Sequence, residues 1–343
     1  MATNVVKEMR DKGLITCEPY ISEPHYLTIM GSFAYGVSSD TSDMDVYGFC
    51  IPPKDIVFPH TIGHIEGFGK QIKRFEVFQQ HHIQFKEKEY DLAIYNIVKY
   101  YQLCMENNPN MIDSLFTPIY CVLHQSQMGE YTRQHRQDFL HKGSFHKLKG
   151  YAFSQIQKAK NKSFKTLFDF CRIHSIPMSE DFDEMRADWD RIDLRTDIKN
   201  KLLELYSLCV AGGKPNPKRV ESIMKYGWDV KFGYHLIRLV DEAEQILVTG
   251  TLDLQRAREH MKAVRSGLIS LEEAEKWFAE KEASLEKLYH ESKMVPYAPD
   301  EEKIKRHLLN CLEMYYGTLE RMEKENQTTV KDIVAILKRD GYA

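Results

Sequence analysis

The pattern of hydrophobic and polar positions divides the chain into a strand-rich first third and a helical remainder. Up to about residue 123, apolar residues come in short runs or in alternation, separated by turn formers, which is typical of β-strands. From residue 94 the apolar spacing becomes helical, and from Ser126 onward apolar residues recur three and four positions apart. The runs that fit strands are residues 26–30, 44–51, 70–78 and 86–94.

This pattern predicts an α+β fold, with an N-terminal α+β domain over residues 1–123 and a mainly helical region over residues 124–343. Turn formers at residues 211–217 interrupt the helical pattern, and residues 179–190 are strongly acidic. Residues from about 165 to 225 could therefore form a peripheral insertion, although a solvated helical face would give the same pattern.

Composition narrows the class of protein. The 43% hydrophobic and 28% charged fractions are those of an ordinary globular protein, and the net charge of −3 means that any nucleic-acid binding needs a local basic surface. The seven cysteines include no Cys-x-x-Cys pair, which favours reduced thiols in a cytoplasmic protein. The chain has no secretory signal and no apolar run of about 20 residues, so we expect no membrane partner.

Two aspartates two residues apart are the first candidate for chemistry. Asp43 and Asp45 flank Met44 in a run with the alternation of a strand, so both carboxylates are expected on one face. Grouped carboxylates repel one another, and a hard cation such as Mg²⁺ relieves this repulsion while accepting oxygen ligands. A Mg²⁺ site is the simplest use for this geometry, although Asp-x-Asp alone is more often a turn or a surface pair.

Gly31 and Ser32 follow the first predicted strand, where a chain that enters a helix exposes backbone N–H groups. Glycine there would let a phosphate approach the backbone, and the Ser32 hydroxyl and the helix N-terminus would supply donors. Gly-Ser is common by chance, but here it is followed by ten residues and then by an Asp-x-Asp that enters a second predicted strand. The combination predicts a phosphate site beside a metal site.

With these residues in view, the stretch GSFAYGVSSDTSDMDVYGFCIPP resembles the DNA polymerase β-like nucleotidyltransferase superfamily. It is most similar to a phage and bacterial nucleotidyltransferase family linked to RNA repair, and weaker similarity continues through NNPNMIDSLF, KFGYHLIRL and VRSGLISLEEAEKW. The resemblance implies a polymerase β-like catalytic domain with a mixed sheet, Mg²⁺ or Mn²⁺ as the cofactor, and a nucleoside triphosphate as a substrate.

The superfamily usually places a third acid on a neighbouring strand, where it completes the metal site and can take the proton of the incoming hydroxyl. Glu87, Glu89 and Asp91 are the candidates, and strand alternation would put all three on one face. Asp91 fits best because it lies between Tyr90 and Leu92, and Glu89 is the second choice. Asp43, Asp45 and Asp91 are thus the predicted catalytic and metal-binding residues.

The implied reaction moves a nucleoside monophosphate from the triphosphate to a hydroxyl group, with an RNA or tRNA end as the favoured acceptor and pyrophosphate as the leaving group. An alternative keeps the same site but modifies a protein or a small molecule, as in toxin-like or antibiotic-modifying relatives. A further alternative is a non-catalytic relative that binds a nucleotide or RNA.

Two groups of cations could support such a site. Lys231, His235 and Arg238 fall at i, i+4 and i+7, so one helical face could present them to the β- and γ-phosphates, or they could form a solvated stripe. Residues 141–165 contain seven lysines, no acid and interleaved aromatic residues, which favours a surface that contacts RNA but also fits an ordinary exposed helix. The lysines proposed for RNA are Lys147, Lys149, Lys158, Lys160 and Lys162.

The adjacent histidines His81 and His82 are a less obvious candidate for metal binding. On a regular strand they would point to opposite faces, so the sequence predicts a structural role for both.

Overall fold

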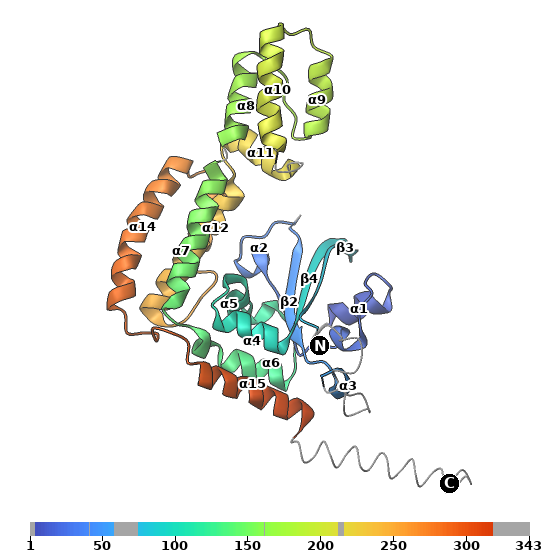
Figure 1. The fold of residues 1–343 in the computed structure, drawn as a ribbon, viewed down its shortest axis with the longest axis vertical. Coiled ribbons are helices and arrows are strands. Elements are labelled where there is room, and N and C mark those ends of the chain that lie inside the picture. The colour runs from blue at the N-terminus through green and yellow to red at the C-terminus, as the bar shows by residue number, and fades with distance from the viewer. Residues whose placement is uncertain (1–3, 41, 58–74, 161, 212–215, 318–343) are drawn as a thin grey trace, which may run out of the picture. The chain divides into compact units, whose positions relative to one another are not determined.

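The computed structural model describes residues 4–40, 42–57, 75–160, 162–211 and 216–317, without the side chains of Asp55, Ala159, Lys160 and Lys162 (Figure 1). The strands are β1 (Tyr26–Ile29), β2 (Met44–Cys50), β3 (Val77–Phe85), β4 (Lys88–Asn96) and β5 (Val122–Gln125). The α-helices up to Lys160 are α1 (Val5–Asp11), α2 (Gly31–Ala34), α3 (Lys54–Val57), α4 (Ile97–Met105), α5 (Pro109–Phe116), α6 (Gln127–Gln134) and α7 (Gly143–Lys160). Those that follow are α8 (Lys162–Ile173), α9 (Phe182–Asp190), α10 (Thr196–Val210), α11 (Pro217–Tyr226), α12 (Val230–Thr249), α13 (Arg258–Arg265), α14 (Leu271–Glu291) and α15 (Glu301–Tyr316). Short 3₁₀ turns are η1 (Pro19–Ser22), η3 (Ile119–Cys121) and η4 (Arg136–Phe139).

The five strands form one mixed sheet with the spatial order β3-β4-β2-β1-β5. Strands β2 and β4 are parallel, whereas the β1–β2, β1–β5 and β3–β4 pairs are antiparallel. Helix α4 packs on β2 and β4, and α6 packs on β1 and β5. The predicted α+β class is confirmed, with a mixed sheet near the N-terminus followed by a mainly helical part.

Strands β1 and β2 follow the sequence pattern closely. Along β2, Met44 and Val46 are buried while Asp45 is partly exposed, as alternation requires. A Cβ on Gly48 would lie 1.9 Å from the carbonyl oxygen of Tyr26, so only glycine lets β1 and β2 pair this closely. Both strands end within one residue of their predicted limits.

A two-residue turn joins β3 to β4. Lys86 and Glu87 have φ values of 49° and 63°, and positive φ at both central residues is the geometry of a tight hairpin that follows the twist of its strands. The prediction of Glu87 on a strand was wrong, because the turn removes it from the alternation. The strand predicted over residues 70–78 overlaps β3 only at its end, and residues 70–74 lie outside the described residues.

Polar caps start the helices that cover this sheet. Asn96 accepts a hydrogen bond from the Val98 amide at 2.8 Å and begins α4. Asn108 caps α5, whose first residue is Pro109, a residue that suits the first position of a helix. Within α5, the buried Asp113 accepts a hydrogen bond from the Tyr35 hydroxyl at 2.7 Å, which fixes the chain just after α2.

Contacts divide the chain into two compact units. Unit 1 comprises Met1–Ser144, Gly250–Gln255 and Val295–Ala343, and it contains the sheet. Unit 2 comprises Phe145–Thr249 and Arg256–Met294. Strand β5, which pairs with β1, crosses residue 123, so residues on both sides of that position share one sheet.

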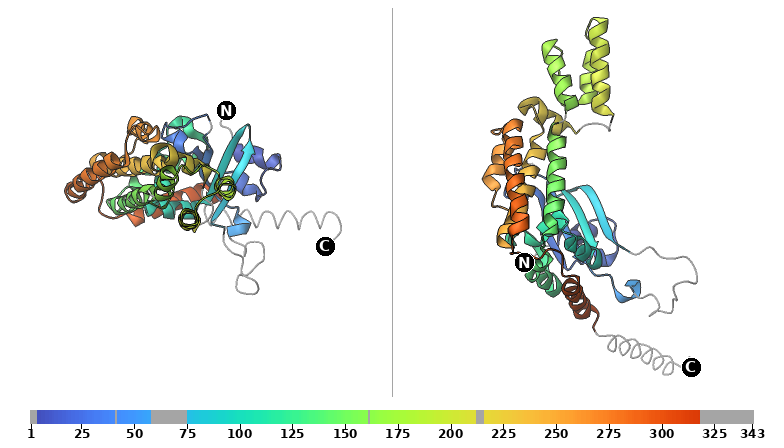
Figure 2. Two further views of the ribbon diagram at one scale, coloured as in Figure 1. Left: turned by 90° about the horizontal axis from the view of Figure 1, so that it is seen from above. Right: turned by 60° about the vertical axis from the view of Figure 1, so that its left-hand side comes forward.

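Unit 2 contains two groups of helices. Helices α7, α12 and α14 run side by side (Figures 1 and 2). Helices α8 to α11 share a separate hydrophobic core, and they span most of the segment from 165 to 225. At its centre Trp189 is 1% exposed, and its indole N–H donates to the Pro177 carbonyl at 2.8 Å.

The cysteines are free thiols, and all of them except Cys17 are buried. Among the described residues, no helix combines the length and the apolar character that crossing a membrane requires.

Candidate functional site

Acids of two neighbouring strands lie at the same level of the sheet. Asp45 of β2 pairs with Asp91 of β4 in the parallel register, and partners across a parallel pair present their side chains to one face. On the other side of β2, the Met30 amide donates to the Asp45 carbonyl oxygen at 2.7 Å. The end of β1, the start of β2 and Asp91 are therefore neighbours.

The backbone of Gly31 lies directly against the Asp45 carboxylate. Gly31 has a φ of 63°, and a Cβ built on it would lie 2.0 Å from Oδ2 of Asp45. Glycine is required here both for its backbone conformation and for the room that it leaves for the carboxylate. The sequence suggested only the approach of a phosphate as the reason for this glycine.

Gly31 and Ser32 open α2, which is a single turn of four residues. The amides at the start of a helix have no acceptor within it, so those of this turn suit a phosphate. The turn is short, however, and any helix dipole is correspondingly small.

Asp43 lies one residue before β2 and is exposed. The pKa of His82 is raised first by its hydrogen bond to Glu89, and also by the charges of Asp91 and Asp43. The charge of Asp43 therefore acts on His82, as the charges of Glu89 and Asp91 do, although Asp43 precedes β2.

A β-bulge in β3 brings both histidines to Asp91. The regular pairing of β3 with β4 is interrupted between Gln80 and Ile83, and His82 has a φ of 58°. The His82 amide donates to Oδ1 of Asp91 at 2.9 Å, and Nδ1 of His81 lies 3.3 Å from Oδ2 of the same carboxylate. The prediction that alternation separates the two histidines was wrong, because the bulge breaks the alternation.

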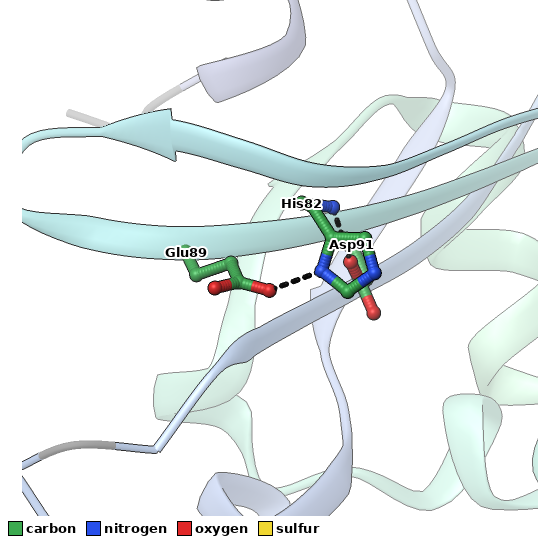
Figure 3. A group of neighbouring side chains, drawn as sticks. All are labelled: His82, Glu89 and Asp91. Atoms are coloured by element: carbon green, nitrogen blue, oxygen red, sulfur yellow. Dashed lines mark hydrogen bonds and ion pairs between the residues drawn. The ribbon is translucent and has the colours of Figure 1, made fainter. Parts of the chain in front are cut away.

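The imidazole of His82 also contacts Glu89. Its Nδ1 is hydrogen-bonded to Oε1 of Glu89 (Figure 3). The side-chain amide of Gln84 donates to the other carboxylate oxygen of Glu89 at 3.3 Å. Glu89 and Asp91 lie on the same face of β4, as the period of two requires. Asp91 is the one of the two that pairs with Asp45.

The carboxylates of these acids fit a hard divalent cation. Asp45 and Asp91 share a face, Asp43 precedes Asp45, and carboxylate oxygens are the ligands that Mg²⁺ and Mn²⁺ prefer. Negative charge from several acids is concentrated at one end of β2 and β4, and a bound cation would reduce its repulsion.

The three candidates on α12 belong to unit 2 and differ in exposure. Lys231 is exposed, His235 is partly buried, and Arg238 is buried with its Nε 3.4 Å from Oε1 of Glu242. The pKa of His235 is held well below its usual value, first by burial and then by the charges of Arg238 and Lys231, among others.

The sequence pattern did not indicate Arg219 or Arg265, and it predicted Lys158 as an RNA contact without placing it beside α12. Arg219 of α11 lies with its guanidinium carbon 4.2 Å from the centre of the Phe232 ring, and Nζ of Lys158 lies 5.7 Å from the same ring. Arg265 of α13 lies 5.3 Å from the Tyr234 ring. Local spacing gives no signal for this grouping, because the residues come from four separate helices.

We call Lys158, Arg219, Lys231 and Arg265 the basic cluster of unit 2. The charges of Arg219, Lys231 and Arg265 all lower the pKa of His235, after the larger effects of burial and Arg238. The carboxylate of Asp229 lies 3.9 Å from Arg219. The cluster is a concentration of positive charge in a net acidic chain.

The lysine-rich helix α7 divides into different environments. Nζ of Lys149 lies 2.9 Å from Glu282 and 2.7 Å from Glu286, so two carboxylates neutralise it. Tyr151 and Phe153 are 48% and 56% exposed. The side chains of the predicted Lys160 and Lys162 lie outside the described residues, and Lys147 lies near the start of the helix.

A comparison of the chain with protein families gives a match over most of its length. The family model of RlaP, described as the RNA repair pathway DNA polymerase beta family, matches residues 24–314. That range includes β1 to β5 and the basic cluster. No curated protein and no solved structure matches the chain.

Proposed function

Because the chain belongs to the RNA repair pathway DNA polymerase beta family, we propose that it is a Mg²⁺-dependent nucleotidyltransferase that adds a nucleoside monophosphate to a hydroxyl at an RNA or tRNA end. The observation that carries the proposal is the alignment of Asp45 with Asp91, with Gly31 packed against the Asp45 carboxylate. The carboxylate oxygens that could bind a metal thus lie beside the first turn of α2, whose backbone amides could bind a phosphate. Nucleotide transfer requires both kinds of group.

In the proposed reaction, the acceptor hydroxyl oxygen forms a bond to the α-phosphorus, and the bond from the α-phosphorus to the bridging oxygen of the β-phosphate breaks. The nucleotide is joined to the acceptor and pyrophosphate leaves. Asp43, Asp45 and Asp91 would hold the cation, and Asp91 would accept the hydroxyl proton. Bound Mg²⁺ supplies charge that stabilises the entering and leaving oxygens.

The histidine contacts give Asp91 a defined orientation for this role. Both of its oxygens have partners on the β3 bulge, one in the His82 amide and one in the His81 ring. The amides of Gly31 and Ser32, with the Ser32 hydroxyl, would bind phosphate oxygens. The protein contributes position and charge, not a covalent intermediate.

We propose that unit 2 binds phosphates. Lys231, His235 and Arg238 are the predicted residues, but Arg238 is buried beside Glu242, whereas Arg219 and Arg265 are partly exposed and add positive charge near Lys231. A guanidinium forms paired hydrogen bonds to phosphate oxygens more readily than an ammonium does. The Phe232 ring beside two cations could also stack on a base.

Transfer is tested with the full chain, Mg²⁺, total RNA and each of the four nucleoside triphosphates labelled at the α-phosphate. We expect pyrophosphate release and label in RNA with at least one triphosphate, and neither with the Asp43→Ala, Asp45→Ala double variant. Label in protein instead of RNA would support the alternative acceptor. No pyrophosphate release with any triphosphate, or equal release by the double variant, would contradict the enzyme proposal.

Substitutions of two lysines in α7 test RNA binding. Lys158→Ala is expected to weaken RNA binding about threefold to tenfold and to lower the slope of log Kd against log salt by about one, because a phosphate contact is lost. Lys149→Ala is expected to change the Kd by less than about twofold, since Glu282 and Glu286 already neutralise this ammonium.

Fluorescence anisotropy with a labelled oligoribonucleotide at several salt concentrations measures both constants. Thermal melting checks that each variant is folded. If the Lys149 variant loses as much affinity as the Lys158 variant, RNA does not discriminate between the two environments, and the proposed role of Lys158 fails.

A further inference from the structure

We propose that His82, Glu89 and Asp91 form a mixed imidazole and carboxylate site that binds a transition-metal dication such as Co²⁺ or Zn²⁺ more tightly than Mg²⁺. The inference deepens the proposed function because Asp91 is shared with the proposed catalytic site. It is tested by metal binding, which requires no turnover.

The geometry already brings three possible ligand atoms together. One nitrogen of His82 and one carboxylate oxygen each from Glu89 and Asp91 all lie within 4.8 Å of one another. Figure 3 shows the imidazole beside the Glu89 carboxylate and overlapping the Asp91 side chain in this view, and both acids come from the neighbouring strand β4. The His82 side chain is 81% exposed, so an ion can reach the group from solvent.

The β-bulge is what creates this group. Glu89 and Asp91 share a face because they are two residues apart on β4. In β3, the extra residue and the positive φ of His82 turn its side chain toward those acids, while its amide holds Oδ1 of Asp91. A regular strand would place only one of His81 and His82 on that face.

The ligand types determine which metals are favoured. Mg²⁺ prefers an octahedral shell of oxygens and keeps several waters, whereas imidazole nitrogen suits Zn²⁺ and related transition ions. One nitrogen and two carboxylate oxygens also leave open positions for water or a substrate oxygen, as catalytic zinc sites do. The His81 ring lies 3.3 Å from Oδ2 of Asp91, so it would orient the Asp91 carboxylate without binding the metal itself.

The other interpretation of the same contacts is a set of surface ion pairs, in which His82 only bonds to Glu89. The two interpretations differ in what removing the imidazole does. An ion-pair network would lose local order but no metal affinity, whereas a metal ligand would carry a measurable part of the binding of a transition ion.

The experiment titrates Co²⁺ into the full-length protein and follows its visible absorption, with Mg²⁺ as a competitor. We compare the wild type with His82→Asn, because asparagine tolerates a positive φ but lacks the imidazole. The matched control is His290→Asn, which removes an exposed histidine from α14 in unit 2.

We expect His82→Asn to weaken Co²⁺ binding by about tenfold or more, and His290→Asn to bind as the wild type does. Mg²⁺ affinity should change by less than about threefold in either variant, because Mg²⁺ gains little from imidazole. The Asp43→Ala, Asp45→Ala variant should retain the His82-dependent Co²⁺ site even though it cannot carry out the proposed transfer.

Equal Co²⁺ affinity in the wild type and His82→Asn would overturn the inference, as would a wild-type site that prefers Mg²⁺. Loss of Co²⁺ binding in the Asp43→Ala, Asp45→Ala variant would also overturn the inference, because it would show that His82, Glu89 and Asp91 do not form the site by themselves. Because each readout is binding, a protein that fails to transfer nucleotides could still give the expected result, and an active enzyme could still fail this test.

Discussion

Asp45→Asn is expected to lower kcat for nucleotidyl transfer by about 10³-fold or more while leaving the fold intact. Asparagine has nearly the same shape, so it keeps the packing against Gly31, but it lacks the negative charge that a divalent cation requires. The link from β2 to β1 uses the Asp45 backbone carbonyl, which the substitution does not change. The measurement is single-turnover pyrophosphate release at saturating triphosphate and Mg²⁺.

Asp40→Asn is the matched control, because Asp40 is an exposed acid in the loop that leads to β2. It removes one negative charge from the loop just before β2 and is expected to change kcat by less than about twofold. Thermal melting should give similar midpoints for both variants and the wild type. An Asp45→Asn enzyme with a rate near that of Asp40→Asn would remove Asp45 from the proposed metal site.

Strands β1, β2 and β4 could be predicted because their local patterns are strong, whereas β3 lies mostly beyond the predicted residues 70–78 and β5 was not predicted. In β2, buried Met44 and Val46 alternate with Asp45, and this alternation is visible in the sequence before any pairing is known. The same pattern on β4 kept Glu89 and Asp91 together as candidates. Which of them stands opposite Asp45 depends on the register of two strands about 45 residues apart, and local pattern does not contain that information.

The histidine bulge could not be predicted from alternation. A bulge adds one residue to one strand, and its position depends on the pairing with the neighbouring strand. The one local signal is that histidine, like asparagine and aspartate, adopts positive φ more often than most residues. That preference is too weak to override a strand pattern, so His81 and His82 were assigned to opposite faces.

The cations of unit 2 show a second limit of prediction from the sequence. The spacing of Lys231, His235 and Arg238 predicted one face, and the structure buries Arg238 beside Glu242, four residues further on the same helix. That Arg–Glu pair at i and i+4 was visible in the sequence. Arg219 was not, since only the packing of α11 brings its guanidinium to Phe232.

Gly31→Ala is expected to reduce transfer by about 10²-fold or more and to lower stability by about 1–3 kcal/mol. A φ of 63° is unfavourable for alanine, and its Cβ would lie 2.0 Å from Oδ2 of Asp45. Either the turn or the Asp45 carboxylate must move, and both are parts of the proposed site. Gly13→Ala separates the two causes, because Gly13 has a φ of 71° but nothing within 4 Å of the added Cβ.

The Gly13 variant should therefore lose about 1 kcal/mol of stability and keep its activity. A double-mutant cycle measures how much stability is lost to the clash between the added methyl group and the Asp45 carboxylate. The free energies of unfolding are obtained by chemical denaturation. Asp45→Ala removes Oδ2 and Cγ and leaves only its Cβ, 3.6 Å from the position of the added methyl group. In that background Gly31→Ala should cost no more stability than Gly13→Ala does. If Gly31→Ala costs the same with and without the Asp45 carboxylate, the backbone of Gly31 does not constrain that carboxylate, and the glycine would serve the turn alone.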